Sequence, residues 1–385
     1  MNPKQVVKSV CKFIFTMAYK DKNKIVFESE PDFCDNSRCL YDYMIKNKYN
    51  EKYKMIWCVK NPKNFKDMKV KNVSFTSFRE KRYLLNYLYH IATAKTVIYT
   101  HATPPMINTS KQTVACLWHG TPLKHMNFIK TDTDPFTFIA SASKFCSDAL
   151  ADCFQVSQEK IKVTGYPRCD TLFEDSNVLK KLDIDRGKWK KIVLWMPTFR
   201  QSSQLNIFDS HETQTGLPLI ETSEQLTALN QKLQEQGLFM IIKLHPLQDL
   251  SGVDLVVLSN IKMLTSDELD KSIVQLYHLV SNVDILLTDY SSIYFDYLLL
   301  DRPIGFIIDD IEEYNKKRGF VTQEPLEIMP GTKMKTVEEL YRFFEDVSND
   351  KDEYANDRAR VNDIVNEYKD NKSALRLLDL LEISK

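Results

Sequence analysis

Short apolar runs alternate with segments of helical periodicity along most of the chain. The runs are rich in β-branched and aromatic residues, which predicts buried strands, and the alternation with helices predicts parallel sheets in an α/β fold. We expect strands at 24–29, 55–59, 73–75, 96–100, 113–118, 137–141, 161–167, 191–196, 238–242, 255–258, 283–287 and 303–308. We expect helices at 39–46, 78–94, 144–153, 223–236, 292–300, 336–346 and 352–382.

The length of 385 residues exceeds what one hydrophobic core comfortably supports, so two domains are expected. The charged stretch 171–190 separates two series of strands and helices, and we interpret it as the linker. The prediction is therefore an N-terminal doubly wound, Rossmann-like domain at 1–170 and a second one at 191–385. Strand ends of the two domains would face each other across a cleft.

Composition argues against several classes of function. Lys and Arg total 52, as do Asp and Glu, so the basic excess of a general nucleic-acid-binding protein is missing. Only nine glycines occur, and no G-x-G-x-x-G or Walker-type loop is present, which disfavours nicotinamide and P-loop sites. The eight cysteines show no C-x-x-C spacing, so we expect free thiols in a reducing cytoplasm. No apolar run reaches the length of a transmembrane helix.

The N-terminal segment has the pattern of a basic amphipathic helix. The first twenty residues contain no acid, apolar residues recur at helical spacing from 6 to 17, and Lys4, Lys8 and Lys12 form a separate stripe. This pattern is typical of a segment that lies on an anionic membrane surface. A helix packed on its own domain explains it equally well. The basic and aromatic segment 78–94 is a second membrane candidate, for which a core helix is the alternative.

Three polar clusters follow three expected strands. Gly120 and Pro122 stop the apolar run 113–118, so His119 is placed at the carboxyl end of a strand. A lone histidine at such a position is usually only a turn residue. His119 is not alone, however, because His245 follows the apolar run 238–242 in the same way. A third cluster, made of Thr288, Asp289, Ser291 and Ser292, follows the run 283–287. Ligands bind at the carboxyl edge of open α/β sheets, so the three clusters predict a site.

The third cluster suggests a phosphate site. Ser291 or Ser292 is a good N-cap, and a helix start offers free N–H groups to an anion, although every capped helix has this feature. Arg200 and Lys243 follow neighbouring strands and strengthen the case, because cationic side chains stabilise a diphosphate. The turns contain no paired-carboxylate cluster, so we expect neither a metal nor another cofactor.

The polar clusters also carry a family resemblance. The segments WHGTPLK at 118–124, TGYPR at 164–168, PTFR at 197–200, KLHP at 243–246, TDYSS at 288–292 and DRP at 301–303 resemble the motif series of the CDP-glycerol glycerophosphotransferase family. That family builds teichoic acids and related phosphate-linked polymers. The resemblance covers about residues 110–335, and the motifs stand in the family's order. The length of the chain is closer to that of the family's short primases than to that of its polymerases.

The resemblance implies a GT-B fold and an enzyme peripheral to the cytoplasmic face of the membrane. The implied reaction transfers glycerol phosphate or ribitol phosphate from a CDP-alditol to a hydroxyl of an acceptor linked to a polyprenyl diphosphate in the membrane, releasing CMP. The family's two histidines fall on His119 and His245, and its serine pair on Ser291 and Ser292. We expect His119, on the acceptor-side domain, to act as the general base, and His245, Arg200, Lys243 and the serines to hold the diphosphate.

The remaining motif residues have supporting parts in this interpretation. Gly120, Thr121 and Arg302 are expected to support the site, and Thr288 to belong to the phosphate turn. Asp289 organises that turn or touches the ligand; the two are about evenly weighted.

Two other functions fit part of the pattern. A GT-B glycosyltransferase that uses a nucleotide sugar would share the cleft and the phosphate site. A non-catalytic lipid- or polymer-binding protein of the same fold would retain ligand without turnover, although the retained His119 and His245 weigh against it. The sequence does not choose between glycerol and ribitol, or between priming and chain extension.

Overall fold

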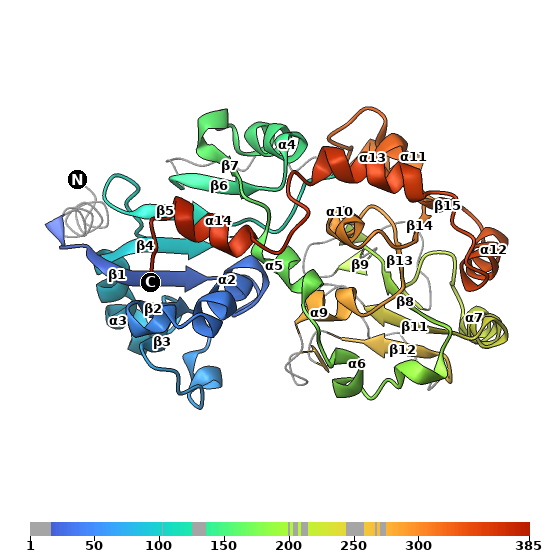
Figure 1. The fold of residues 1–385 in the computed structure, drawn as a ribbon, viewed down its shortest axis with the longest axis horizontal. Helices are drawn as coiled ribbons and strands as arrows, with labels where there is room; N and C mark the ends of the chain where they lie inside the picture. The colour runs from blue at the N-terminus through green and yellow to red at the C-terminus, as the bar shows by residue number, and fades with distance from the viewer. Residues whose placement is uncertain are drawn as a thin grey trace. The chain divides into compact units, whose positions relative to one another are not determined.

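The computed structural model describes residues 17–101, 103–124, 136–198, 201–202, 207–208, 215–243, 258–265, 268–269 and 275–385. The chain divides into two compact units. Unit 1 consists of Met1–Thr121, Asn127–Thr171 and Glu367–Lys385, and unit 2 of Pro122–Met126 and Leu172–Asn366. Each unit is built on one parallel sheet (Figure 1).

Unit 1 holds a seven-stranded sheet in the order β3-β2-β1-β4-β5-β6-β7, and all its strand pairs are parallel. The chain runs outward from β1 to one edge and then from β4 to the other, so the topological switch point lies between β1 and β4. The strands are β1 Asp21–Glu28, β2 Lys54–Cys58, β3 Val73–Thr76, β4 Ala94–Tyr99, β5 Thr113–Cys116, β6 Phe138–Ser141 and β7 Ile161–Val163.

The helices of unit 1 connect these parallel strands. Helix α4 begins at a cap in which the Ser143 hydroxyl accepts from the Cys146 N–H, at 3.2 Å. Aromatic side chains under α2 fill the β1–β2 side of the core, where Phe27 and Trp57 stack at 5.2 Å between centroids. The helices are α2 Asp35–Lys46, α3 Lys81–Thr93, α4 Lys144–Phe154, α5 Pro167–Asp170 and α14 Ser373–Leu380.

The end of the chain belongs to unit 1, whereas the sequence interpretation placed it in the C-terminal domain. Helix α14 lies beside α2 and α5 (Figure 1). The buried carboxylate of Asp170 accepts from the N–H groups of Ser373 and Ala374, at 3.0 and 2.8 Å, and so caps α14 from a distant part of the sequence. A single helix expected at 352–382 is accordingly wrong, because α13 ends at Val365 and the chain crosses to unit 1 before α14 begins.

Unit 2 holds a six-stranded parallel sheet in the order β12-β11-β8-β13-β14-β15 and a short antiparallel hairpin of β9 and β10. The central strands β8, β11 and β13 are almost wholly buried, as parallel strands covered by helices on both faces must be. The strands are β8 Lys191–Met196, β9 Gln201–Ser202, β10 Ile207–Phe208, β11 Leu238–Lys243, β12 Ile261–Leu264, β13 Ile285–Thr288, β14 Ile304–Ile307 and β15 Thr332–Met334.

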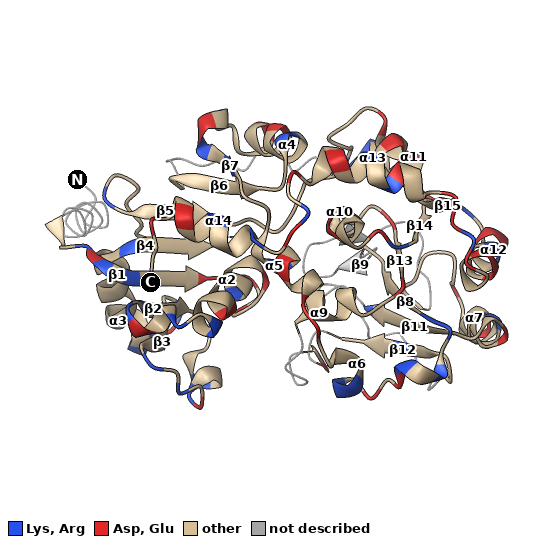
Figure 2. Ribbon diagram, in the orientation of Figure 1, with Lys and Arg blue, Asp and Glu red and all other residues tan. Residues whose placement is uncertain are grey.

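Several helices of unit 2 carry charged side chains. Figure 2 shows Lys, Arg, Asp and Glu on α7, α12 and α13, while the middles of β8, β11 and β13 are free of them. Helices α7 and α12 begin with capping boxes at Thr222 and Thr336, and the C-cap of α7 is Gly237, whose φ of 69° suits a glycine. The helices are α6 Val178–Lys181, α7 Ser223–Gln236, α9 Leu276–Ser281, α10 Ile293–Tyr297, α11 Ile311–Lys317, α12 Val337–Ser348 and α13 Ala355–Val365.

The strands expected from the sequence are present where the structure describes those residues, with small differences at their ends. Strand β15 was missed, because Thr332–Met334 is too brief for a periodic signal. The strand expected at 255–258 lies almost wholly outside the described residues, and the edge strand of the sheet is β12 at Ile261–Leu264. None of the described helices is both long and apolar enough to cross a bilayer.

Candidate functional site

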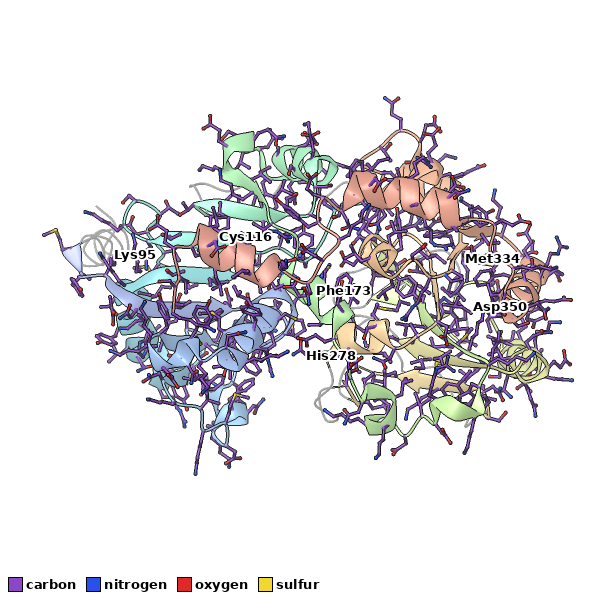
Figure 3. All side chains as sticks on the ribbon, viewed as in Figure 1. Lys95, Cys116, Phe173, His278, Met334 and Asp350 are labelled. Atoms are coloured by element: carbon purple, nitrogen blue, oxygen red, sulfur yellow. The ribbon has the colours of Figure 1, made fainter. Side chains whose placement is uncertain are left out.

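His119 lies in the loop that follows β5, at the carboxyl edge of the unit 1 sheet. Strand β5 ends at the buried Cys116 (Figure 3), and Trp118 then adopts a left-handed backbone with φ of 49°. Gly120 has φ of 120°, a conformation that glycine reaches without steric cost. The indole of Trp118 packs edge-on against Phe154 at 4.8 Å between centroids, which fixes one side of the loop. His119 is left half-buried at the sheet edge.

A buried asparagine anchors this loop. Asn36, fully buried at the start of α2, donates from Nδ2 to the carbonyl oxygens of Trp118 and Leu117, at 2.8 and 3.3 Å. Its Oδ1 accepts from the backbone N–H of Arg168, at 3.1 Å. The Arg168 guanidinium pairs with Asp35 at 3.0 Å. One side chain therefore ties two motif segments, 118–124 and 164–168, to each other.

A second histidine stacks on the first. The rings of His101 and His119 are parallel within 4°, with centroids 4.4 Å apart. The Thr100 hydroxyl lies 2.9 Å from Nδ1 of His101. Burial lowers the pKa of His101, Arg168 lowers it further, and Asp35 and Glu30 oppose this. Neither His101 nor Asn36 was expected at the site from the sequence, although their positions after β4 and β1 were the available signal.

Asp289 lies at the carboxyl edge of the unit 2 sheet and joins two strand ends. Its buried Oδ2 accepts from both the N–H and the hydroxyl of Thr198, each at 2.8 Å. Next to it, the Thr288 hydroxyl donates to the Met196 carbonyl at 2.8 Å. These bonds hold the chain directly after β8 against the end of β13. Asp289 thus organises the turn, and ligand contact by Asp289 stays a prediction.

The motif at 118–124 contributes to both units. Residues up to Thr121 group with unit 1, and Pro122–Met126 group with unit 2. In unit 2, the Val321 N–H donates to the Leu123 carbonyl at 3.0 Å, and the backbone of Lys124 forms an isolated antiparallel β-bridge with that of Phe320. Burial lowers the pKa of Lys124, the neighbouring Arg318 lowers it further, and Asp289 opposes this. Lys124 and Arg318 are cations at the Asp289 turn that the sequence analysis did not assign to the site.

The other predicted donor-side residues have different surroundings. Lys243, at the end of β11, is buried. Ser291 and Ser292 are half-buried, and Ser292 occupies the N-cap position of α10 as expected, although its side chain makes no capping bond. Helix α10 has only five residues, so it contributes little dipole. His245 and Arg200 lie outside the described residues.

Arg302 does not join this group. Its guanidinium donates to the carbonyl oxygens of Ser281 and Val283, at 2.8 and 2.5 Å, ahead of β13. That is the amino edge of the sheet, because Arg302 itself precedes β14. Arg302 supports the strands rather than the site edge. Among the described residues, no group of three or more His, Cys, Asp and Glu is arranged to hold a metal ion.

Comparison with known proteins connects this geometry with a family. The model of a family described as CDP-glycerol:poly(glycerophosphate) glycerophosphotransferase matches residues 10–383. A teichoic acid poly(glycerol phosphate) polymerase of Bacillus spizizenii is 29% identical over 348 residues, covering 83% of this chain and 82% of that protein. One of Bacillus subtilis is 30% identical over 376 residues, covering 89% of this chain, which spans 47% of that relative's length.

A solved structure has the same fold. The wall teichoic acid polymerase TagF, in crystals soaked with CDPG, matches with a TM-score of 0.75 and 23% identity, covering 98% of this chain and 95% of that one. The matched region of the family model includes both sheets and every motif segment described above. The chain therefore belongs to the CDP-glycerol:poly(glycerophosphate) glycerophosphotransferase family.

Proposed function

We propose that the protein transfers glycerol phosphate or ribitol phosphate from a CDP-alditol to a hydroxyl of a membrane-linked acceptor, in the synthesis of teichoic acid or a related cell-surface polymer. The observation that carries the proposal is the family match over residues 10–383, which includes the His119 loop and the Asp289 turn. The proposal takes units 1 and 2 as the two domains of a GT-B transferase. It assigns the acceptor to unit 1 and the donor to unit 2.

The chemistry assigned to His119 is proton removal. The acceptor oxygen attacks the phosphorus that bears the alditol, and a new P–O bond forms as the bond from that phosphorus to the bridging oxygen breaks. The acceptor proton passes to the imidazole, and CMP leaves with the bridging oxygen. An imidazole is suited to this step because it exchanges a proton near neutral pH. Lys243, Lys124 and Arg318, with Arg200 and His245 as expected from the sequence, would balance the charge on the leaving phosphate.

A comparison of several nucleotide-linked donor substrates tests the proposal directly. Purified protein is incubated with CDP-glycerol, CDP-ribitol and UDP-sugars, and release of CMP or UDP is measured with and without acceptor. CMP release that depends on a CDP-alditol and an acceptor supports the transferase. UDP release from a nucleotide sugar would support the glycosyltransferase alternative instead, and ligand retention without any turnover would support a binding protein.

His119→Ala should lower kcat by about 10²–10⁴-fold, the usual contribution of a general base, and leave CDP-alditol affinity nearly unchanged. Donor affinity by calorimetry and turnover at saturation are measured side by side. His278→Ala, on α9 and paired with Glu174 at 3.6 Å, is the matched control and should retain activity. Poor donor binding with near-normal kcat in His119→Ala would make His119 a binding residue and contradict the assignment.

Asn36→Leu should lower kcat by about tenfold or more, because the His119 loop loses its anchor and small misplacements of a reacting group are costly. The control is Asn47→Leu, which removes a 2.9 Å bond to the Tyr43 carbonyl at the other end of α2. If Asn36 acts through His119, adding Asn36→Leu to His119→Ala should cause little further loss. Additive losses in the double variant would argue against this positioning role.

Turnover should persist in EDTA, because the proposal assigns the charge of the diphosphate to lysine and arginine side chains rather than to a metal ion. The assay is CMP release from CDP-glycerol before and after chelation and dialysis. Complete loss of activity that Mg²⁺ restores would overturn this part of the proposal.

We also propose that the protein acts as a peripheral protein at the cytoplasmic face of the membrane. Helix α3 supports this, because Leu85 and Tyr89 are 80% and 59% exposed, and Lys81 and Arg82 lie on the same helix. The basic helix expected within the first twenty residues lies largely outside the described residues. Exposed apolar side chains next to cations suit an anionic bilayer better than water.

Co-sedimentation with vesicles that contain phosphatidylglycerol should be strong at low salt and fall as salt rises. Leu85→Ser combined with Tyr89→Ser should reduce the bound fraction severalfold without changing turnover on a soluble acceptor. Exposed Leu375→Ser on α14 is the matched control. A protein that stays in the supernatant at low salt would contradict membrane association.

A further inference from the structure

Glu28 is a buried carboxyl group that the proposed mechanism does not use. It is the last residue of β1, and 7% of its surface is exposed. Its Oε2 is buried and has no hydrogen-bond partner among the described residues. Burial raises the pKa of Glu28 to about 8, even though Arg79 and Lys60 lower it. A buried polar group without a partner destabilises a fold, so its presence requires an explanation.

The position of Glu28 is that of a ligand site. Strand β1 lies next to β4 (Figure 1). Phe27 pairs with Ile98, so Glu28 lies beside Tyr99 at the carboxyl edge. This is the topological switch point of the sheet, where open α/β sheets hold their ligands. The chain after β4 continues into Thr100 and His101, and His101 stacks on His119. Glu28 therefore ends β1 and the proposed base follows β5, the two strands that flank β4.

Charged side chains form the rim of this edge. Glu30 pairs with Lys60 and, at 3.5 Å, with Arg79, and the Lys60 N–H donates to Asp32 at 2.6 Å. Each of these four groups influences the ionisation of Glu28, so they lie around its carboxyl. Glu30 also acts on His101. The rim contains two cations and two acids, and this balance favours a hydroxyl-bearing ligand over a free anion.

We propose that Glu28 and His101, at the β1–β4 switch point, bind the hydroxyl-bearing polyol end of the acceptor and present it to His119. The inference rests on the proposed function for its choice of ligand. A carboxyl that is un-ionised at neutral pH both donates to and accepts from a hydroxyl, which satisfies the partnerless oxygen. The acceptor hydroxyl would thus supply a hydrogen bond to Glu28 that the fold itself does not provide.

Two substitutions of Glu28 separate binding from folding. Glu28→Leu removes both oxygens at nearly constant volume, and Glu28→Gln keeps one donor and one acceptor. Calorimetry without donor measures the Kd of a short soluble glycerol phosphate oligomer. We expect Kd to rise about tenfold in Glu28→Leu and to stay within about threefold in Glu28→Gln. Inorganic phosphate should bind all variants alike.

Thermal unfolding distinguishes a role of Glu28 in ligand binding from a role in stabilising the fold. Removal of a buried group without a partner should leave Tm unchanged or raise it in Glu28→Leu, while acceptor binding falls. Lys24→Met, on the same strand at its amino half, removes the 2.7 Å bond to Thr93 and should not alter oligomer affinity. CDP-glycerol affinity should be unchanged in every variant.

Each outcome decides the inference. Unchanged oligomer affinity in Glu28→Leu would overturn it, as would a lower Tm accompanied by parallel losses of donor and oligomer affinity. If the native protein releases no CMP from any CDP-alditol, yet binds the oligomer in a manner that depends on Glu28, the proposed transferase fails and the polyol site stands. If the native protein turns over a CDP-alditol normally and Glu28→Leu keeps full affinity for the oligomer, the proposed transferase stands and the polyol site fails.

Discussion

Parallel strand pairing is the constraint on which the rest of the structure depends. Every pairing in the two large sheets is parallel, and helices connect the strands, so most strand residues are buried. A buried strand has no place for reactive polar groups along its length. Such groups collect where the strands end, and the parallel direction brings the carboxyl ends of a sheet together. His119 and Asp289 both lie immediately beyond such ends.

The same constraint explains why the two edges of a sheet differ in role. At the amino edge of unit 2, Arg302 donates to the carbonyl oxygens ahead of β13, which completes the backbone hydrogen bonding of the core. At the carboxyl edge, Asp289 binds Thr198 and leaves Lys124 and Arg318 nearby as cations. The hydrogen bonds of Arg302 are made within the protein at the amino edge, and the proposed donor site lies at the carboxyl edge.

Buried side-chain amides and carboxylates hold the motif loops in place. Asn36 accounts for three backbone groups of two segments that are far apart in sequence, and Asp289 accounts for the loop after β8. Removal of either would leave buried backbone groups unpaired, which is more costly than the loss of an exposed bond. The family motifs therefore include residues that hold the loops in place as well as residues that are proposed to react.

The sequence by itself determined the α/β class, nearly all strands and the position of His119 at a strand end. These properties depend on local patterns, because apolar runs and a stop at Gly120 are readable within a few residues. The motif series likewise indicated the family, which the match over residues 10–383 confirms.

Only the tertiary structure decided which side chains share an edge. Asn36 and Arg168 are 132 positions apart, and Asp170 caps a helix that begins at Ser373, so neither contact has a local signal. The break between α13 and α14 was hidden for the same reason, because the chain leaves one core for another there. The burial of Glu28 and the stacking of His101 on His119 depend on strand order, which hydrophobic periodicity does not encode.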